Sequence, residues 1–487
     1  MSHAPRLSDQ HLSLIAEGVE IPAYDRTAVS IGVVHLGPGA FHRAHQADVF
    51  DRLLAADSRW GVCAVSLKSA GVRDALTPQD GLYTLVELDR EVRFRVIGAL
   101  KQVLAAPQAP DEVLAALASP KVAVVTLTVT DKGYCLTGAG QLDLAHPDIV
   151  HDIGRPEVPE SAIGWLVAGL RLRHTAGAPP VSVISCDNLT DNGRKLGAAV
   201  KALAAAQGDD ALAAWIETGA AFPNTMVDSI TPATDDALRA RVEDRIGLQD
   251  AWPIQREAFT QWVIEDRLAP GAPDFASAGV TLTSDVRPFE QAKLRLLNGA
   301  HSSLAYLGCL AGLETVGDAM ADAALAGFAG RLMREDIAPT LTPAPGQDIP
   351  AYIDALLARF RNPAIRHKLS QIAWDGSMKL PFRLLGTITD ALAAGRSIER
   401  LCAPVAAWIG FVVDRARKGE ALTDPMAETL LALGRTAGDD AATTVDQFLA
   451  LKSVFPPALA AAPAFREAVI KAYAALAKGE IAAVLAI

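Results

Sequence analysis

Residues 31–67 constrain the fold of this chain more than any other part of its sequence. Residues 31–36 have the composition of a short buried strand, and a glycine-containing turn follows at 37–39. Residues 41–54 then carry apolar side chains at helical spacing, and 60–67 are predicted to form the next strand. A strand, a glycine turn, a helix and a second strand in this order are typical of the start of a doubly wound α/β domain.

Further strands are predicted downstream, at 81–88, 92–98, 122–129 and 181–186, with a helix at 163–174. The stretch 122–129 is nearly all apolar and rich in β-branched residues, as expected of a central parallel strand. The strand 181–186 is followed by Asp187 and Asn188. Because ligands of open parallel sheets sit beyond the carboxyl ends of the strands, Asn188 is placed where it could meet a substrate group.

The second part of the chain has a different character. At 487 residues the chain is too long for one ordinary core, and two domains are expected. Beyond about residue 285 it is rich in Ala and Leu at helical spacing. Helices are predicted near 288–313, 320–335, 350–360, 385–395, 401–418, 425–434 and 464–485. We therefore expect an α/β domain at 1–285, a mostly α-helical domain at 286–487, and a cleft between them.

The composition excludes several classes of protein. The net charge is −11 without a basic run, so no nucleic-acid partner is expected. Residues 1–10 lack the pattern of a signal peptide, and no apolar run reaches membrane-spanning length, so a cytoplasmic protein without a membrane partner is predicted. The five cysteines are scattered, which favours free thiols over disulfides or a zinc cluster, and no metal is expected.

The turn Gly37-Pro38-Gly39 is a candidate site for the pyrophosphate of a dinucleotide. Glycines between a strand and a helix are common, and His42 stands where the third glycine of G-x-G-x-x-G would be. The second strand ends in Ser66-Leu67-Lys68-Ser69, without the acid that binds the adenosine ribose; Asp74 is the nearest downstream candidate. Lys68 and Arg73 could instead face a 2′-phosphate, so the preference between NAD and NADP stays open.

The stretch 293–302 carries the candidate catalytic residues. At roughly 100° per residue, Lys293, His301 and Asn298 fall at roughly 0°, 80° and 140° and share one broad helix face. A lysine can remove the proton of an alcohol while hydride leaves its carbon, and amides can stabilise the alkoxide without a metal. The alternative interpretation is a solvated face on which Asn298 and His301 are satisfied core groups.

Five sequence blocks together resemble the mannitol dehydrogenase family of long-chain polyol-specific dehydrogenases and reductases. They are residues 37–46, 128–134, 185–188, 293–302 and 375–381. The resemblance implies a Rossmann-type dinucleotide-binding domain and a helical substrate-binding domain, and many members act as metal-free monomers. It implies Lys293 as general base, Asn188 and Asn298 as the oxyanion site, and His301 as a group that orients a substrate hydroxyl. It also implies substrate contacts from Asp228 and Lys379, and cofactor contacts from Gly37, Gly39, Phe41 and Arg43.

Two substrate classes follow from the resemblance. The leading hypothesis is an NAD(H)-dependent polyol 2-dehydrogenase of the mannitol/fructose type, and the alternative is a fructuronate reductase that forms D-mannonate. A hexuronate needs a clamp for its carboxylate, for which Arg366, Lys379 and Arg383 are candidates. Gln371 stands where some polyol-oxidising members have an Arg, which leaves the distal substrate contacts open. A hypothesis of another class is a nicotinamide-binding sensor without catalysis, against which the intact Lys293, Asn298 and His301 argue.

Overall fold

The computed structural model describes residues 4–487, and the first three residues of the chain lie outside this description. The chain divides into two compact units. The first ends at Val286, and the second is Arg287–Ile487.

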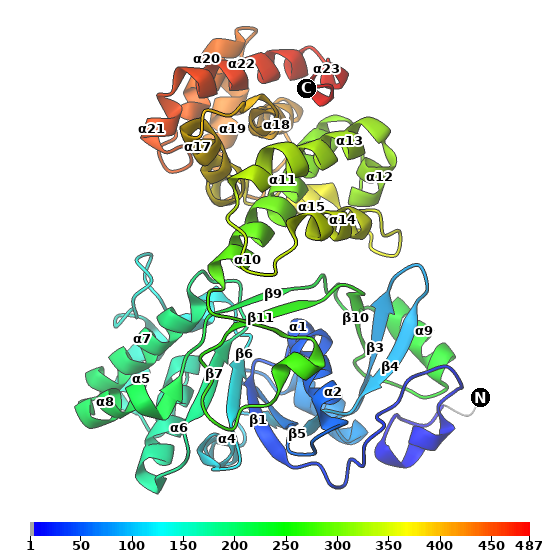
Figure 1. Ribbon diagram of the computed structural model, residues 1–487, viewed down its shortest axis with the longest axis vertical. Helices are drawn as coiled ribbons and strands as arrows, with labels where there is room; N and C mark the ends of the chain where they lie inside the picture. Colours follow the sequence, from blue (N-terminus) through cyan, green and yellow to red (C-terminus); the bar gives the residue numbers. More distant parts are fainter. Residues whose placement is uncertain (1–3) are drawn as a thin grey trace. The chain divides into compact units, whose positions relative to one another are not determined.

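A parallel sheet of six strands forms the centre of the first unit (Figure 1). Its order is β5-β2-β1-β6-β7-β8, and all neighbouring strands run parallel. Counted along the chain within this sheet, the order is that of a Rossmann sheet. The fold class predicted for this part of the chain is therefore confirmed. The strands are β1 (Ile31–Leu36), β2 (Gly61–Ser66), β5 (Leu100–Ala105), β6 (Val124–Leu127), β7 (Val181–Ser185) and β8 (Ala220–Ala221).

Helices cover both faces of this sheet because its strands alternate two sets of apolar side chains. Val34 and Leu36 belong to one core cluster, and Val33 belongs to another on the opposite face. The first face is covered by α4 (Pro110–Ala118), α5 (Pro147–Gly154), α6 (Ala162–Ala176), α7 (Asn192–Ala206) and α8 (Asp210–Gly219). The second face is covered by α1 (Ala40–Ala44), α2 (Gln46–Leu54) and α3 (Gly71–Leu76).

Two smaller sheets of three strands complete the first unit, together with α9 (Asp236–Ile246). The predicted strands at 81–88 and 92–98 are confirmed, but they pair in the order β10-β3-β4 outside the main sheet. Their side chains extend the core that α2 covers. The strands are β3 (Tyr83–Leu88), β4 (Arg93–Ile97) and β10 (Ile254–Glu257), and in the other sheet β9 (Thr225–Asp228), β11 (Gln261–Glu265) and β12 (Thr281–Thr283).

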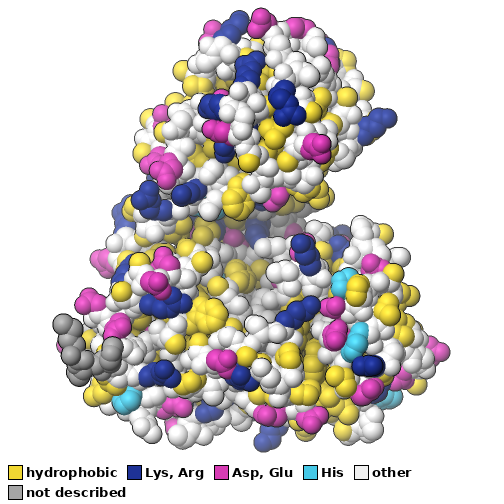
Figure 2. Space-filling model, turned by 180° about the vertical axis from the view of Figure 1, so that it is seen from behind, with side chains coloured by type: hydrophobic (Ala, Val, Ile, Leu, Met, Phe, Trp, Pro, Cys, Tyr) yellow, Lys and Arg dark blue, Asp and Glu magenta, His cyan; other side chains and the backbone are white. Residues whose placement is uncertain are grey.

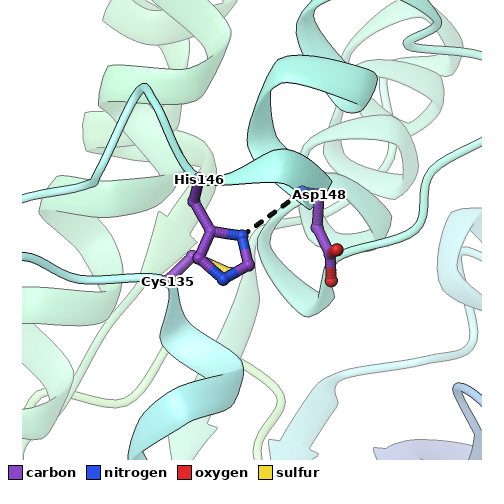
Figure 3. A group of neighbouring side chains, drawn as sticks. All are labelled: Cys135, His146 and Asp148. Atoms are coloured by element: carbon purple, nitrogen blue, oxygen red, sulfur yellow. Dashed lines mark hydrogen bonds between the residues drawn. The ribbon is translucent and has the colours of Figure 1, made fainter.

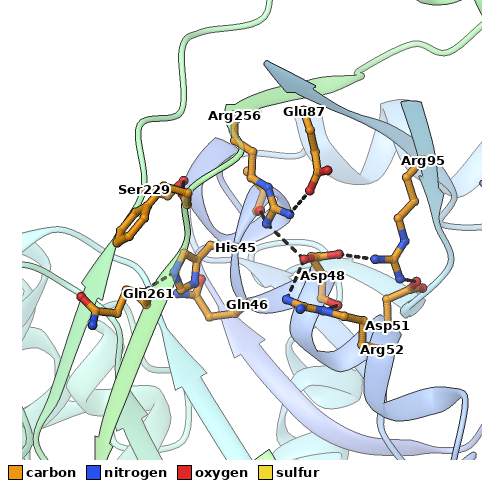
Figure 4. Close-up of polar contacts among 12 residues, drawn as sticks. His45, Gln46, Asp48, Asp51, Arg52, Glu87, Arg95, Ser229, Arg256 and Gln261 are labelled. Atoms are coloured by element: carbon orange, nitrogen blue, oxygen red, sulfur yellow. Dashed lines mark hydrogen bonds and ion pairs between the residues drawn. The ribbon is translucent and has the colours of Figure 1, made fainter. Parts of the chain in front are cut away.

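A buried ion-pair network ties α2 to the sheet of β3, β4 and β10 (Figure 4). The Asp48 side chain is 1% exposed, and its carboxylate pairs with Arg95 at 2.8 Å and Arg256 at 3.1 Å. Arg52, one turn further along α2, reaches the same carboxylate at 2.9 Å. Arg95 also pairs with Asp51 at 2.6 Å. These buried ion pairs favour a single arrangement of α2 relative to β4 and β10, because any arrangement that broke a pair would leave a buried charge uncompensated.

The second unit is helical, and no strand is assigned anywhere in 287–487. Its core surrounds α18 (Glu399–Lys418), whose Trp408 is 1% exposed. Three segments are π-helical: Lys293–Asn298, Leu332–Ile337 and Pro381–Leu385. The other helices are α10 (Arg287–Ala292), α11 (Gly299–Leu310), α12 (Val316–Ala321), α13 (Ala323–Arg331), α14 (Ile349–Phe360), α15 (Leu369–Ile372), α16 (Gly376–Leu380), α17 (Gly386–Ala393), α19 (Ala427–Thr436), α20 (Ala441–Leu449), α21 (Pro457–Ala460), α22 (Pro463–Ala477) and α23 (Ile481–Leu485).

Four predicted helices are interrupted in the structure. The helix expected over 320–335 is divided among α12, α13 and the π-helical segment Leu332–Ile337, and the helix expected over 464–485 is divided into α22 and α23. The helix expected over 41–54 is interrupted at His45, whose backbone (φ −122°, ψ −80°) leaves the helical region while its ring binds the Gln261 carbonyl. The helix expected over 288–313 is α-helical only at its two ends, α10 and α11. The prediction of an uninterrupted α-helix was wrong at each of these four places.

The distribution of charged side chains and the lengths of the helices concern the nucleic-acid and membrane partners that the sequence analysis did not expect. Basic and acidic side chains are interspersed on the face shown in Figure 2. Within residues 4–487, no helix is long and apolar enough to cross a membrane.

Replacing Asp48 should destabilise the first unit strongly. Asp48→Asn keeps the shape of the side chain but removes the buried carboxylate that Arg256 and Arg95 share, leaving Arg256 only Glu87 and half-buried Arg95 only Asp51. Breaking a buried pair of this kind costs about 3–5 kcal/mol. Arg52→Ala is the matched control: its side chain is 39% exposed, and its loss should cost about 1 kcal/mol or less. Urea unfolding followed by tryptophan fluorescence compares the two variants, and equal midpoints would contradict this account of the network.

Candidate active site

The turn after β1 requires a glycine at its first position. Gly37 has φ +90°, and a Cβ built on it would lie 2.3 Å from the Thr128 carbonyl oxygen. The Thr128 hydroxyl in turn donates to the Gly37 carbonyl at 2.7 Å. At Gly39, in contrast, the nearest atom to an added Cβ is the Gly37 carbonyl oxygen at 3.9 Å, so the protein itself leaves room for a side chain there.

A cavity of about 560 Å³ opens at this turn. It lies beyond the carboxyl ends of β1, β2 and β6, where doubly wound sheets bind their ligands. We call it the β1 crevice. Gly37 and Gly39 line it, as the dinucleotide hypothesis requires. Its other lining residues are Pro38, Ser66, Leu67, Lys68, Ser69, Val72, Thr128, Val129, Thr130, Lys132, Gly133, Cys135, His146, Asp148, Glu160, Ser161 and Ala162.

Asp187 anchors the loop that forms one wall of this crevice. Its carboxylate accepts the backbone N–H groups of Val129 and Thr130, both at 2.9 Å, and the Tyr134 hydroxyl at 2.8 Å. The blocks at 128–134 and 185–188, which lie far apart in sequence, therefore form one hydrogen-bonded structure. Asn188 follows Asp187 beyond the end of β7 and is exposed.

The residues after β2 differ in their access to the crevice. Lys68 lines it and pairs with Asp148 at 3.2 Å. Asp74 is 61% exposed and pairs with its neighbour Arg73 at 2.6 Å, and it is not among the lining residues. Asp74, the acidic residue that the sequence suggested for binding the adenosine ribose, therefore pairs with Arg73 outside the crevice.

Cys135, His146 and Asp148 are the group of possible metal ligands found within the described part of the chain (Figure 3). Their ligand atoms lie within 4.8 Å of one another. His146 Nδ1 already accepts the Asp148 backbone N–H at 3.3 Å, which caps α5, and Asp148 pairs with Lys68. Burial, with Asp148 next in importance, raises the pKa of the Cys135 thiol to about 11. Because all three side chains are engaged or protonated, we assign no metal to them.

Arg43 and Phe41 are not brought to the β1 crevice. Arg43 is 1% exposed, lies against the rings of Tyr83 and Trp252, and donates to the Trp252 carbonyl at 2.7 Å. Burial lowers the pKa of its guanidinium to about 10. Phe41 stacks on His45, with ring centroids 5.0 Å apart. In the first unit by itself, these side chains hold α1 in place.

His42, which replaces the third glycine of the dinucleotide motif, is also a core residue. Its ring stacks on His35 at 3.3 Å and is fully buried. Burial holds the pKa of His42 well below its usual value, so the ring is neutral at physiological pH.

In the second unit, Lys293 and Asn298 begin and end a π-helical segment. The angular spacing predicted for Lys293, Asn298 and His301 assumed an α-helix throughout, and this was wrong across 293–298, where the hydrogen bonds run from i to i+5. Lys293 and Asn298 are half-buried, and His301, in the first turns of α11, is 8% exposed. π-Helical turns within α-helices are frequent at functional sites.

His301 lies in a cationic neighbourhood. Its ring packs on Phe360 at 4.5 Å and against His367 at 5.6 Å. Burial holds the pKa of His301 well below its usual value, and His367, Arg359 and Arg383 add to this effect, so His301 is neutral. Arg359 was not predicted from the sequence, because it lies far from His301 along the chain and no motif links the two residues.

Arg383 reaches the same place from the π-helical segment Pro381–Leu385. Its Nη1 donates to the Ser302 hydroxyl at 3.1 Å. A Cβ on Gly299 would lie 2.9 Å from the Arg383 carbonyl oxygen, so the glycine of the Asn298-Gly299 pair permits the close approach of the two segments. Lys379 donates to the Ile372 carbonyl at 3.3 Å, and burial, followed by Arg383, lowers the pKa of its amine.

The remaining candidates lie apart from this group. Arg366 is 78% exposed and 3.9 Å from Glu314, and Gln371 is also exposed. Arg295 pairs with Asp390 at 2.6 Å and so has a structural role. Asp228 belongs to the first unit, at the end of β9, and is 6% exposed.

Both units match known domains. The mannitol dehydrogenase Rossmann domain matches residues 31–276, and the mannitol dehydrogenase C-terminal domain matches residues 285–477. The chain belongs to the mannitol dehydrogenase family. The resemblance drawn from the sequence blocks is thereby confirmed, as is the pairing of a Rossmann domain with a helical domain.

Individual members of the family are similar over nearly the whole chain. D-mannonate oxidoreductase of Escherichia coli (strain K12) is 42% identical over 462 residues, which are 93% of this chain and 94% of that protein. Mannitol 2-dehydrogenase of Phaeosphaeria nodorum is 38% identical over 438 residues, 88% of this chain and 77% of that protein. The structure of Pseudomonas fluorescens mannitol 2-dehydrogenase in a ternary complex with NAD and D-mannitol superposes with a TM-score of 0.82, at 37% identity and 99% coverage of both chains. These relationships identify the chain as an oxidoreductase.

The two glycines of the turn should respond differently to alanine. Gly39→Ala meets no protein atom closer than 3.9 Å and should keep its stability, but its methyl group would occupy the approach to a pyrophosphate and weaken NADH binding about tenfold or more. Gly37→Ala should lose stability as well, by on the order of 1–3 kcal/mol, because of its positive φ and the Thr128 carbonyl. Thermal unfolding and NADH fluorescence titration measure the two effects. Unchanged NADH affinity in folded Gly39→Ala would refute the cofactor assignment of the turn.

Proposed function

We propose that this chain is an NAD(H)-dependent, metal-independent oxidoreductase that interconverts a secondary alcohol of an open-chain sugar acid with the corresponding ketone, as between D-mannonate and fructuronate. The proposal rests mainly on one observation, the pair of neighbouring cations Arg383, which acts on His301, and Lys379, which acts on His367. Neither Arg383 nor Lys379 has a carboxylate within salt-bridge distance in residues 4–487. Half-buried cations without such partners suit an anionic ligand.

The β1 crevice fits the proposed cofactor. Its turn has glycine at two of three positions, Gly37 and Gly39, so the backbone borders the cavity at the end of β1, as the approach of a pyrophosphate requires. A bound nicotinamide would accept or donate the hydride. The P. fluorescens relative was solved in complex with NAD and D-mannitol, which supports the same class of reaction for this chain.

Lys293 is proposed as the general base. In the direction of oxidation its amine would take the hydroxyl proton of the substrate, and in reduction its ammonium would return it. The amide N–H groups of Asn298 and Asn188 would donate to the developing alkoxide. His301, being neutral, offers one donor and one acceptor nitrogen, which suits the binding of a neighbouring hydroxyl. Asp228 is proposed as a further acceptor for substrate hydroxyls.

The substrate carboxylate is proposed to bind Arg383 and Lys379. Arg383 is held by Ser302, the residue after His301, so a carboxylate on its guanidinium would lie near the hydroxyl that His301 orients. Asp375 and Asp424 raise the pKa of the Lys379 amine, but burial and Arg383 outweigh them, so the net change in its pKa is downward. The 42% identity to D-mannonate oxidoreductase supports this assignment.

The second candidate is the mannitol/fructose reaction that the sequence favoured. It is supported by the similarity to mannitol 2-dehydrogenases, and it would use the same Lys293, Asn298 and His301. A nicotinamide-binding sensor is less well supported, since a sensor has no need of a lysine and an amide on one π-helical segment.

Lys293→Ala should lower kcat by about a hundredfold to ten-thousandfold, the usual contribution of a general base. Its affinity for NADH should stay within about twofold, since the β1 crevice lies wholly in residues 37–162. Exposed Lys452→Ala is the matched control and should behave as the wild type. Steady-state rates and NADH titration provide the readouts; full turnover in Lys293→Ala would remove the lysine from the mechanism.

Fructuronate should be reduced faster than fructose at equal concentration, in the presence of EDTA. Arg383→Gln and Lys379→Met should each raise the KM for fructuronate about tenfold to a hundredfold through the loss of a charged hydrogen bond, with a smaller effect on fructose. Arg383→Lys, which keeps the charge, should recover part of the loss. Turnover of fructose alone would instead establish the polyol reaction, and loss of activity in EDTA would exclude the metal-independent mechanism.

A further inference from the structure

We propose that the β1 crevice accepts NADP(H) as well as NAD(H), and that Lys68 and Ser69 bind the 2′-phosphate. This inference rests on the proposed use of the crevice for a nicotinamide cofactor, but not on the identity of the sugar substrate. It concerns the end of β2, which is the position in a Rossmann sheet that meets the ribose 2′ substituent of the adenosine.

Four consecutive residues at this position line the crevice: Ser66, Leu67, Lys68 and Ser69. A carboxylate here would accept a hydrogen bond from a 2′-hydroxyl and repel a 2′-phosphate. The chain has instead a lysine and two hydroxyls, which are donors for phosphate oxygens. The nearest acid downstream, Asp74, is turned toward Arg73 and does not line the crevice.

The present partner of Lys68 is one that a phosphate can displace. The Lys68 side chain is 78% exposed and that of Asp148 is 24% exposed, and their 3.2 Å pair joins the end of β2 to the start of α5. Exposed pairs of this kind contribute little to stability. A phosphate carries up to two negative charges and three acceptor oxygens, so it competes well with one carboxylate for the same ammonium.

A second cation, Arg73, lies on α3, the short helix that begins shortly after Lys68. Arg73 follows Val72, which lines the crevice, and its guanidinium is held between Asp74 at 2.6 Å and Gln108 at 2.7 Å. Asp148 remains available as an acceptor for the 2′-hydroxyl of NAD(H), so acceptance of the phosphorylated cofactor does not exclude the other.

Nucleotide fragments test this without any sugar substrate. Calorimetric titration of the full chain with 2′,5′-ADP and with 5′-AMP should show the former binding about tenfold more tightly, with an advantage that shrinks as salt increases. Lys68→Glu should abolish the advantage and leave 5′-AMP affinity within about twofold. Lys121→Glu, the same charge change at an exposed site outside the crevice, should leave the advantage intact.

Equal affinity for the two nucleotides, or an advantage that survives in Lys68→Glu, would overturn the inference while leaving the cofactor assignment standing. Failure of both nucleotides to bind would overturn the inference together with the cofactor assignment. The kcat/KM values for NADPH and NADH give a second readout: NADPH should support turnover in the wild type, and Lys68→Glu should lower its kcat/KM about tenfold relative to that of NADH.

Discussion

The close approach of Gly37 to the Thr128 carbonyl is the constraint on which the cofactor part of the molecule depends. It brings the ends of β1 and β6 together, at a separation that no side chain on residue 37 would permit. Asp187 then holds the loop after β6 through Val129 and Thr130, so the wall of the crevice is fixed by backbone contacts rather than by large side chains. A surface of exposed backbone and small residues is what a pyrophosphate requires.

The glycine-containing block and the residues that follow it directly also supply the polar anchors of α1 and α2. Asp48 pairs with arginines from β4 and β10, and His45 binds the Gln261 carbonyl on β11. Burial lowers the pKa of His45 to about 4, so it is bound as a neutral ring. A family block thus mixes residues at the crevice with residues that fix the elements around it, and only the structure separates the two roles.

Apolar runs were sufficient to predict β1, β2, β6 and β7, because buried parallel strands are hydrophobic on both faces. They were not sufficient for the edge strand β5, where Lys101 and Gln102 interrupt the pattern, or for the short strands β8 and β12. The glycine turn and the order of catalytic candidates could be read locally. The π-helical segments could not, because i to i+5 bonding depends on how neighbouring helices pack rather than on local propensity.

The helical unit shows how one short motif serves chemistry and packing together. Asn298 and His301 are candidates for substrate contact, while Gly299 between them admits the backbone of Arg383. That approach carries the guanidinium to Ser302 and sets a cation beside a histidine that burial already keeps neutral. A neutral imidazole can bind a hydroxyl, and the adjacent cations can bind an acid. This combination is the basis on which we propose a sugar chain that ends in a carboxylate, rather than a polyol, as the ligand.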